Sequence, residues 1–238
     1  MTFEAVIFDA DETIFNNQGI HIIVTRRVLA SQELSEDLVE QVHSKWDEFY
    51  FSEQSRVVEE AGFCIDRENA ARSLVLALKE FGKEISLEEA EKYWEFMREE
   101  YSKRSKPYPD AIRLINYLEK KGIRMAIVSN GDTEIIHKRL KNAGIEHHFE
   151  FVIAPCNEFP LTKPDMKIFH ESLSKLKITA EKTVFVGDNP SSDVMGANRV
   201  GMFSVLIDRY GVNSELEGLQ IPNLKISSFE EMKSIFEK

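Results

Sequence analysis

The sequence predicts an α/β fold in which a parallel sheet, covered by helices on both faces, is interrupted by an inserted all-helical domain. Three observations support this prediction. Short apolar runs such as Val6–Phe8 are typical of strands buried on both faces of a sheet. Beyond Pro109, such runs alternate with segments of helical periodicity. Between the first run and Pro109, the apolar spacing is helical throughout.

The inserted segment has apolar residues at intervals of three or four positions, as in Leu38 and Val42, which is the spacing of a helix. The pattern of Ser86–Glu89 is that of a capping box, which marks the start of a further helix. The segment ends at Pro107–Pro109, because a proline disrupts the interior of a helix. The passage Ile14–Gly19 contains turn-forming residues and is expected to be a loop.

The rest of the chain alternates strands and helices. The predicted strands are Met125–Val128, Phe151–Ile153, Thr183–Val186, Phe203–Leu206 and Leu224–Ile226. Asp110 is expected to cap one helix, and a second helix is expected to follow Asp132. Three further helices are expected to start near Asp165, Ser192 and Ser228. Because strand–helix repeats with continuous apolar strands form parallel sheets, residues 1–18 and 105–238 are predicted to form a Rossmann-like core domain, and residues 19–104 an inserted helical domain.

The composition limits the partners. The chain of 238 residues has a formal net charge of −11, which disfavours nucleic acid or an anionic membrane as a partner. We find no apolar run of membrane-spanning length and no basic and apolar leader, so we expect a cytoplasmic protein. Cys64 and Cys156 form no redox or metal motif and are expected to be small core residues. His147 and His148, without further ligands nearby, are expected to lie in a surface loop.

Polar side chains gather in loops that follow the predicted strands. They are Asp9, Asp11, Ser129, Asn130, Lys163, Asp188 and Asp193. Because parallel strands end at one edge of the sheet, these groups are expected to converge, although Lys163 lies some residues beyond its strand. Carboxylates so close together cannot all ionise beside one lysine, so a divalent cation such as Mg²⁺ is expected to compensate them. One carboxyl group could then stay protonated and act as an acid, an arrangement that suits a phosphate ester.

These motifs, in this order, resemble those of the haloacid dehalogenase-like (HAD) hydrolase superfamily, most of whose members are phosphatases. The pattern D-x-D-x-[TV] matches Asp9–Thr13, and a strand that ends in Ser or Thr matches Ser129. A lysine in a Lys-Pro-Asp setting matches Lys163, and G-D-x-x-x-x-D matches Gly187–Asp193. The inserted helices stand where the family places its helical C1 cap. The resemblance therefore implies a hydrolase that acts on phosphoric monoesters.

The resemblance implies that Asp9 is the nucleophile that forms an aspartyl-phosphate, and that Asp11 protonates the leaving alcohol and then activates water. It also implies that Asp9, Asp188 and the backbone carbonyl of Asp11 bind Mg²⁺. Asp11 favours phosphate chemistry over the alternative, a 2-haloacid dehalogenase, because those enzymes lack an aspartate at this position and need no Mg²⁺. A phospho-acceptor signalling module is disfavoured, because receiver domains carry no large helical insertion.

The resemblance further implies that Ser129, Asn130 and Lys163 bind the phosphoryl oxygens of the substrate. Thr13 is expected to have a supporting role, and Asp193 is expected to support Lys163 or a metal-bound water. A helical cap over such a site would exclude polymers and phosphoproteins. The expected partner is therefore a small phosphorylated metabolite.

Overall fold

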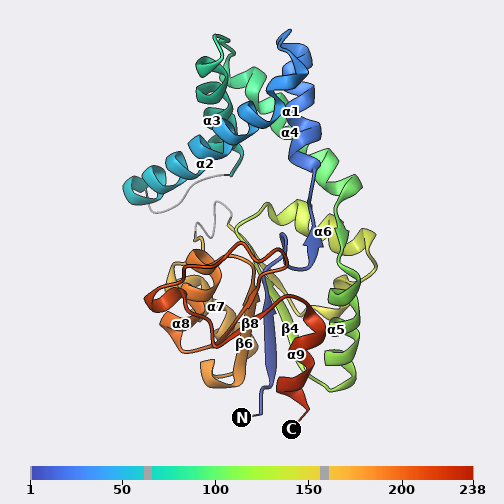
Figure 1. Cartoon of the computed structure of the whole chain (residues 1–238). Helices are drawn as coiled ribbons and strands as arrows, with labels where there is room; N and C mark the ends of the chain where they lie inside the picture. Colours follow the sequence, from blue (N-terminus) through green and yellow to red (C-terminus); the bar gives the residue numbers. More distant parts are fainter. Residues whose placement is uncertain (1, 62–65, 156–160, 238) are drawn as a thin grey trace. The chain divides into compact units, whose positions relative to one another are not determined.

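The computed structural model describes residues 2–61, 66–155 and 161–237 (Figure 1). Within these ranges the chain divides into two compact units. The core unit comprises residues 2–16, 106–155 and 161–237, and the helical unit comprises residues 17–61 and 66–105. Cys64 and Cys156 lie outside the described residues, so their predicted place in a core stays a prediction. Among the described helices, none combines the length and the apolar character needed to cross a membrane.

The core unit is built on a six-stranded parallel sheet. Its strands, in spatial order, are β5 (Val152–Ile153), β4 (Arg124–Val128), β1 (Ala5–Phe8), β6 (Thr183–Gly187), β7 (Phe203–Ile207) and β8 (Leu224–Ile226). In β1, Phe8 is paired with Ile127 of β4 on one side and with Val186 of β6 on the other. The loops that follow β1, β4 and β6 therefore leave the sheet side by side at its carboxyl edge.

Helices cover both faces of this sheet. They are α5 (Pro109–Lys120), α6 (Thr133–Asn142), α7 (Met166–Leu176), α8 (Met195–Val200) and α9 (Phe229–Met232), with short turns η2 (Glu146–His148), η3 (Ala180–Lys182), η5 (Gly218–Gln220) and η6 (Lys233–Phe236) (Figure 1). On one face, Phe8 shares a buried cluster with Leu114 of α5 and Phe229 of α9. On the other face, the ring of Phe185 lies 5.0 Å from that of Phe169 in α7. The strands are thus apolar on both sides, and the predicted α/β class is confirmed.

The start of α5 differs from the prediction that Asp110 caps this helix. Pro109 is its first residue. A proline fits there because the first backbone N–H of a helix has no partner within the helix, so nothing is lost when it is absent. Asp110 therefore lies inside the first turn. Its buried carboxylate accepts the backbone N–H of Phe229 at 3.0 Å and pairs with Arg209 at 2.9 Å. Asp110 therefore joins α5 to the start of α9 instead of capping α5.

Two further segments depart from the prediction. The passage Ile14–Gly19 is only partly a loop, because Phe15–Asn16 forms β2 and pairs antiparallel with β3 (Lys106–Pro107). Such short strands leave no periodicity in the sequence, so the pairing could not be predicted. The helix expected from Ser192 opens instead with a π-helical turn, η4 (Pro190–Val194), and continues as α8.

The helical unit consists of helices alone within the residues that the structure describes. They are α1 (Ile20–Ser31), η1 (Glu36–Leu38), α2 (Val39–Ala61), α3 (Asp66–Glu80) and α4 (Leu87–Arg104). Apolar side chains such as Val24 and Leu74 are fully buried in a cluster of their own. Trp46 belongs to this cluster, and its indole N–H donates to the carbonyl of Ala70 at 3.0 Å. Ser86 caps α4, as its sequence pattern predicts.

Candidate active site

A buried lysine joins two of the predicted carboxylates. Lys163 Nζ lies 2.5 Å from Asp9 Oδ1 and 2.7 Å from Asp193 Oδ1, and the Lys163 side chain is only 2% exposed. Asp9 follows β1, Asp193 lies in η4 after β6, and Lys163 precedes α7. The convergence predicted from the parallel arrangement of the strands is therefore observed for these groups, including the lysine that lies some residues beyond its strand.

Asp193 reaches the lysine because a glycine stands at the end of β6. A Cβ added to Gly187 would lie 2.2 Å from Asp193 Oδ2, a distance that no side chain tolerates. The π-helical turn η4 brings the Asp193 carboxylate back over the strand end, where it also accepts the Asn189 N–H at 3.0 Å. Asp193 is 1% exposed, so this carboxylate is held between Lys163 and the backbone.

The site carries more negative charge than its lysine neutralises. Asp9, Asp188 and Asp193 each offer a carboxylate oxygen, and these oxygens lie within 4.8 Å of one another. Burial raises the pKa of Asp9 to about 7, since the attraction of Lys163 offsets it only in part and Asp193 and Asp11 repel the charge. Burial, with repulsion from Asp9 and Asp193, also holds the pKa of Asp188 well above its usual range. A divalent cation bound by oxygen ligands fits this excess of carboxylates.

The loop after β4 holds the lysine loop in place. The Asn130 side-chain amide donates to the Lys163 carbonyl at 3.0 Å and accepts the Lys163 N–H at 2.7 Å. Both polar atoms of the Asn130 side chain are thus engaged with the backbone of Lys163. Ser129 is 1% exposed, and its hydroxyl oxygen accepts the Gly131 N–H at 3.1 Å. That hydroxyl can still donate its own proton to a ligand.

Asp11 has different partners from Asp9. Its Oδ1 lies 2.6 Å from Arg139 Nη1 of α6, and its side chain is 37% exposed while that of Arg139 is 2% exposed. A Cβ added to Gly131 would lie 3.0 Å from Asp11 Oδ2 and 3.5 Å from Ser129 Oγ. Asp11 and Ser129 therefore lie next to the same glycine. The Arg139 guanidinium also lies 4.8 Å from the centre of the Phe15 ring, which fixes its direction.

Residues far along the chain hold the loop that carries the two aspartates. Arg209 donates to the Thr13 carbonyl at 3.2 Å, and its guanidinium lies 3.7 Å from the centre of the Tyr108 ring. The Tyr108 hydroxyl donates to the Glu12 carboxylate at 2.8 Å. Glu12 has a φ of 53°, a conformation that is uncommon for a non-glycine residue. Thr13 Oγ1 lies 3.5 Å from Asp188 Oδ1, so the predicted supporting residue does face the site.

Sequence reasoning missed Arg139, Tyr108 and Arg209. Arginine is usually a surface residue type, and none of the three residues belongs to a short motif. Their partners are distant in sequence: Arg139 and Asp11 are 128 residues apart, and Arg209 and Thr13 are 196 residues apart. A charged residue on the buried face of an amphipathic helix was the available signal for Arg139, which neighbours the buried Leu140 in α6.

A carboxylate-rich site at the carboxyl edge of a parallel sheet, in a chain with a helical insertion, is the arrangement expected of a hydrolase of the HAD type. The family model of haloacid dehalogenase-like hydrolases matches residues 3–201, so the chain belongs to this family. The resemblance inferred from the motifs is confirmed, and so is the class of enzyme, a hydrolase.

Known proteins resemble this chain to different extents. A glyceraldehyde 3-phosphate phosphatase of Methanopyrus kandleri is 30% identical over 209 residues, which are 87% of this chain and 84% of that protein. Haloacetate dehalogenase H-2 of a Moraxella species is 36% identical over 115 residues, which are 48% of this chain and 50% of that protein. The HAD hydrolase YfnB of Bacillus subtilis, solved with bound magnesium, matches over the whole of both chains with a TM-score of 0.81. At 23% identity, this last likeness shows the fold alone.

Proposed function

We propose that the protein is a Mg²⁺-dependent phosphatase that hydrolyses the phosphomonoester of a small metabolite through an aspartyl-phosphate intermediate. One observation carries the proposal: the Asp11 carboxylate is partly exposed, lies beside Gly131 and Ser129, and is near enough to repel the charge of the buried Asp9. A second carboxyl group in this place supplies the proton that an alkoxide leaving group needs and a halide does not. The near full-length similarity to a glyceraldehyde 3-phosphate phosphatase supports the same reading.

Asp9, Asp188 and the backbone carbonyl of Asp11 would hold Mg²⁺ in this proposal. The donor set fits, because hard oxygen ligands with surplus negative charge are what Mg²⁺ requires. Bound there, the ion neutralises charge on the phosphoryl oxygens and orients the phosphoryl group. The Asp193 carboxylate contacts Lys163 and the Asn189 N–H, so we assign it the role of positioning the lysine and not that of a metal ligand.

Different residues of the chain carry out the separate steps of the reaction. A carboxylate oxygen of Asp9 attacks phosphorus, and the bond from phosphorus to the ester oxygen breaks as the aspartyl-phosphate bond forms. The Lys163 ammonium and the Ser129 hydroxyl bind the phosphoryl oxygens. Asp11 gives its proton to the leaving alkoxide, and its carboxylate then takes a proton from the water that hydrolyses the aspartyl-phosphate. Asn130 contributes by holding the backbone of Lys163.

The helical unit would serve as the family's cap in this proposal, formed by residues 19–104 and hinged on the core domain of residues 1–18 and 105–238. A cap admits substrates that fit beneath it and excludes water during the reaction. We therefore expect small phosphorylated metabolites to be hydrolysed and phosphoproteins to be rejected. Initial rates on a panel of sugar, triose, glycolate and nucleoside phosphates would identify the substrate.

Removal of divalent metal tests the proposal. We expect hydrolysis of 4-nitrophenyl phosphate to stop in EDTA and to return with Mg²⁺. Mg²⁺ at one hundred times its Kd should stabilise the folded protein by about 2.7 kcal/mol, which raises Tm by about 5–10 °C. The control is Asp188→Asn, which removes a proposed ligand and should show little Mg²⁺-dependent shift. Halide release from 2-chloropropionate in EDTA, without phosphatase activity, would instead establish the dehalogenase alternative.

Replacement of Arg139 tests the assigned role of Asp11. Arg139→Gln removes the group that holds the Asp11 carboxylate in place, so we expect kcat for an alkyl phosphate to fall about 10- to 100-fold, part of the contribution of a general acid. The loss should be much smaller for 4-nitrophenyl phosphate, whose leaving group needs no proton, and Arg139→Lys should recover part of the rate. Equal losses on the two substrates would mean that Arg139 has a structural role only.

A further inference from the structure

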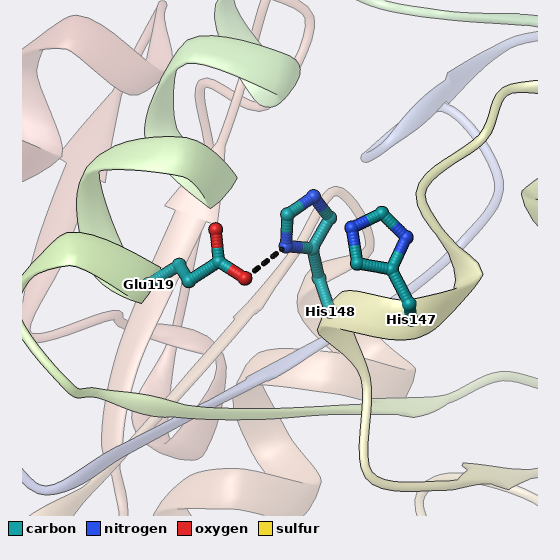
Figure 2. Close-up of side chains that lie close together, drawn as sticks. All are labelled: Glu119, His147 and His148. Carbon is teal, nitrogen blue, oxygen red and sulfur yellow. Dashed lines mark hydrogen bonds and ion pairs between the residues drawn. The ribbon is translucent and has the colours of Figure 1, made fainter.

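Two histidines and a glutamate form a second cluster of metal-ligand side chains. Glu119, His147 and His148 each offer a ligand atom, and these atoms lie within 4.8 Å of one another. His148 Nδ1 lies 3.0 Å from Glu119 Oε1, and the centres of the two imidazole rings are 4.0 Å apart. Figure 2 shows the His148 ring between the Glu119 carboxylate and the His147 ring. The expectation that this histidine pair lacks further ligands nearby was therefore wrong, because Glu119 is 29 residues away in sequence from His148.

The cluster lies at the opposite edge of the sheet from the candidate active site. Glu119 is in the last turn of α5, which leads into the amino end of β4, and the histidines are in η2, which leads into the amino end of β5. Asp9 stands at the carboxyl edge, beyond β1. The five residues of β4 span ~17 Å between these edges. A ligand at the histidine pair therefore does not belong to the site already described.

The backbone that follows the histidine pair is held in place by other contacts. Phe149, next to His148, packs its ring against Phe8, with the ring centres 6.0 Å apart. The Glu150 N–H donates to the Met125 carbonyl at 2.8 Å, and Glu150 also pairs with Arg124. The backbone next to the histidine pair is thus positioned before any ligand binds, which reduces the entropy lost on binding.

We propose that Glu119, His147 and His148 bind a divalent transition-metal ion of the zinc class, with water completing its coordination. Two imidazoles and one carboxylate are a ligand set that Zn²⁺ accepts, at about 2.0–2.2 Å from each atom. Imidazole nitrogens favour Zn²⁺, Ni²⁺ or Cu²⁺ over Mg²⁺, so this site differs in metal from the carboxylate site. The Glu119 side chain is 54% exposed, so an ion can enter from solvent, while the His148 side chain is 7% exposed.

The ion would take the place of the proton between His148 Nδ1 and Glu119 Oε1. Ligand atoms around a tetrahedral Zn²⁺ lie about 3.3–3.5 Å apart, so the 3.0 Å contact has to open slightly and His147 has to turn toward the pair. The metal would then tie the end of α5 to η2. Because it binds the folded chain, it stabilises the core unit without taking part in catalysis.

Zinc binding to the full chain tests this proposal. Titration calorimetry in excess Mg²⁺, which occupies the carboxylate site, should detect one Zn²⁺ per chain, and we expect His147→Gln, His148→Gln and Glu119→Gln each to weaken binding at least tenfold. The matched control is His137→Gln: His137 Nδ1 lies 2.9 Å from Glu146 Oε1, a histidine–carboxylate pair with a similar geometry near η2. This control should bind Zn²⁺ as the unmodified chain does.

Two further measurements separate this site from the proposed phosphatase site. The Cu²⁺-loaded protein should show an electron paramagnetic resonance spectrum with coupling to imidazole nitrogen, and His147→Gln should change it. Mg²⁺-dependent hydrolysis of 4-nitrophenyl phosphate should stay within twofold of the unmodified chain in all three variants. Unchanged Zn²⁺ affinity in the variants, or an equal loss in His137→Gln, would overturn the proposal whatever the protein's catalytic activity.

Discussion

Asp9→Asn is expected to abolish phosphatase activity and yet leave the metal-free protein at least as stable as the unmodified chain. The activity should fall on the order of 10⁴-fold or more, because an amide cannot form the aspartyl-phosphate. The free energy of unfolding should not fall, because ionising the buried Asp9 carboxylate is unfavourable. Burial raises the pKa of Asp9 to about 7, although Lys163 attracts the charge. The neutral amide avoids that cost, and Lys163 keeps its ion pair with Asp193 at 2.7 Å.

The pH dependence of stability follows from the same shift. The native protein keeps the Asp9 proton up to about pH 7, whereas in the unfolded chain the pKa of Asp9 returns to its ordinary value of 3.8. Between these values the folded state binds more protons, so the free energy of unfolding should decrease as pH rises. Urea unfolding in EDTA at pH 5 and pH 8 measures this decrease, which should be smaller in Asp9→Asn. Glu237→Gln, at an exposed carboxylate, is the control.

If Asp9→Asn keeps its phosphatase activity, Asp9 is not the nucleophile. A free energy of unfolding that does not change between pH 5 and pH 8 in the unmodified chain would contradict the assigned cost of the buried charge. Mg²⁺ should reduce the pH dependence, because a cation beside Asp9 favours its ionised form. The stability and activity measurements thus report on different properties of one carboxylate.

Local signals were sufficient to predict the framework of the fold. The run Val6–Phe8 is apolar at every position, and the structure buries it completely at the centre of the sheet. A continuous apolar strand needs cover on both faces, so the class of fold follows from a few residues at a time. Some helix starts were equally local: Ser86 caps α4 as its pattern predicts, and α7 begins directly after Asp165, where a helix was expected to start.

The convergence of the site was predictable for a different reason. Parallel strands bring distant loops to one edge, so their arrangement predicts that Asp9 and Asp193 lie at the same edge of the sheet. The same reasoning cannot choose among side chains that arrive from helices. Arg139 reaches Asp11 from within α6, and Glu119 reaches His148 from the end of α5. These contacts depend on the packing of helices against the sheet, which short sequence patterns do not encode.

Lys163→Met is expected to have the opposite effect on stability from Asp9→Asn. The lysine ammonium lies 2.5 Å from Asp9 and 2.7 Å from Asp193, and all three side chains are buried. Removing one partner of a buried ion pair costs about 3–5 kcal/mol, because the remaining charge is left without compensation. We therefore expect the metal-free variant to lose about this much of its free energy of unfolding at pH 7.5, and to lose its phosphatase activity.

The double variant Asp9→Asn with Lys163→Met separates charge from packing. If uncompensated charge causes the loss, the neutral amide should restore a substantial part of the stability of Lys163→Met, and acidification to pH 5 should restore part of it as carboxyls take up protons. If the loss of stability stays the same in both tests, its cause is instead the packing around the lysine stem. The matched control is Lys182→Met, which breaks an exposed pair with Glu4 and should cost less than about 1 kcal/mol.

Opposite signs for Asp9→Asn and Lys163→Met would mean that the site is short of positive charge, which is the physical reason for proposing a divalent metal there.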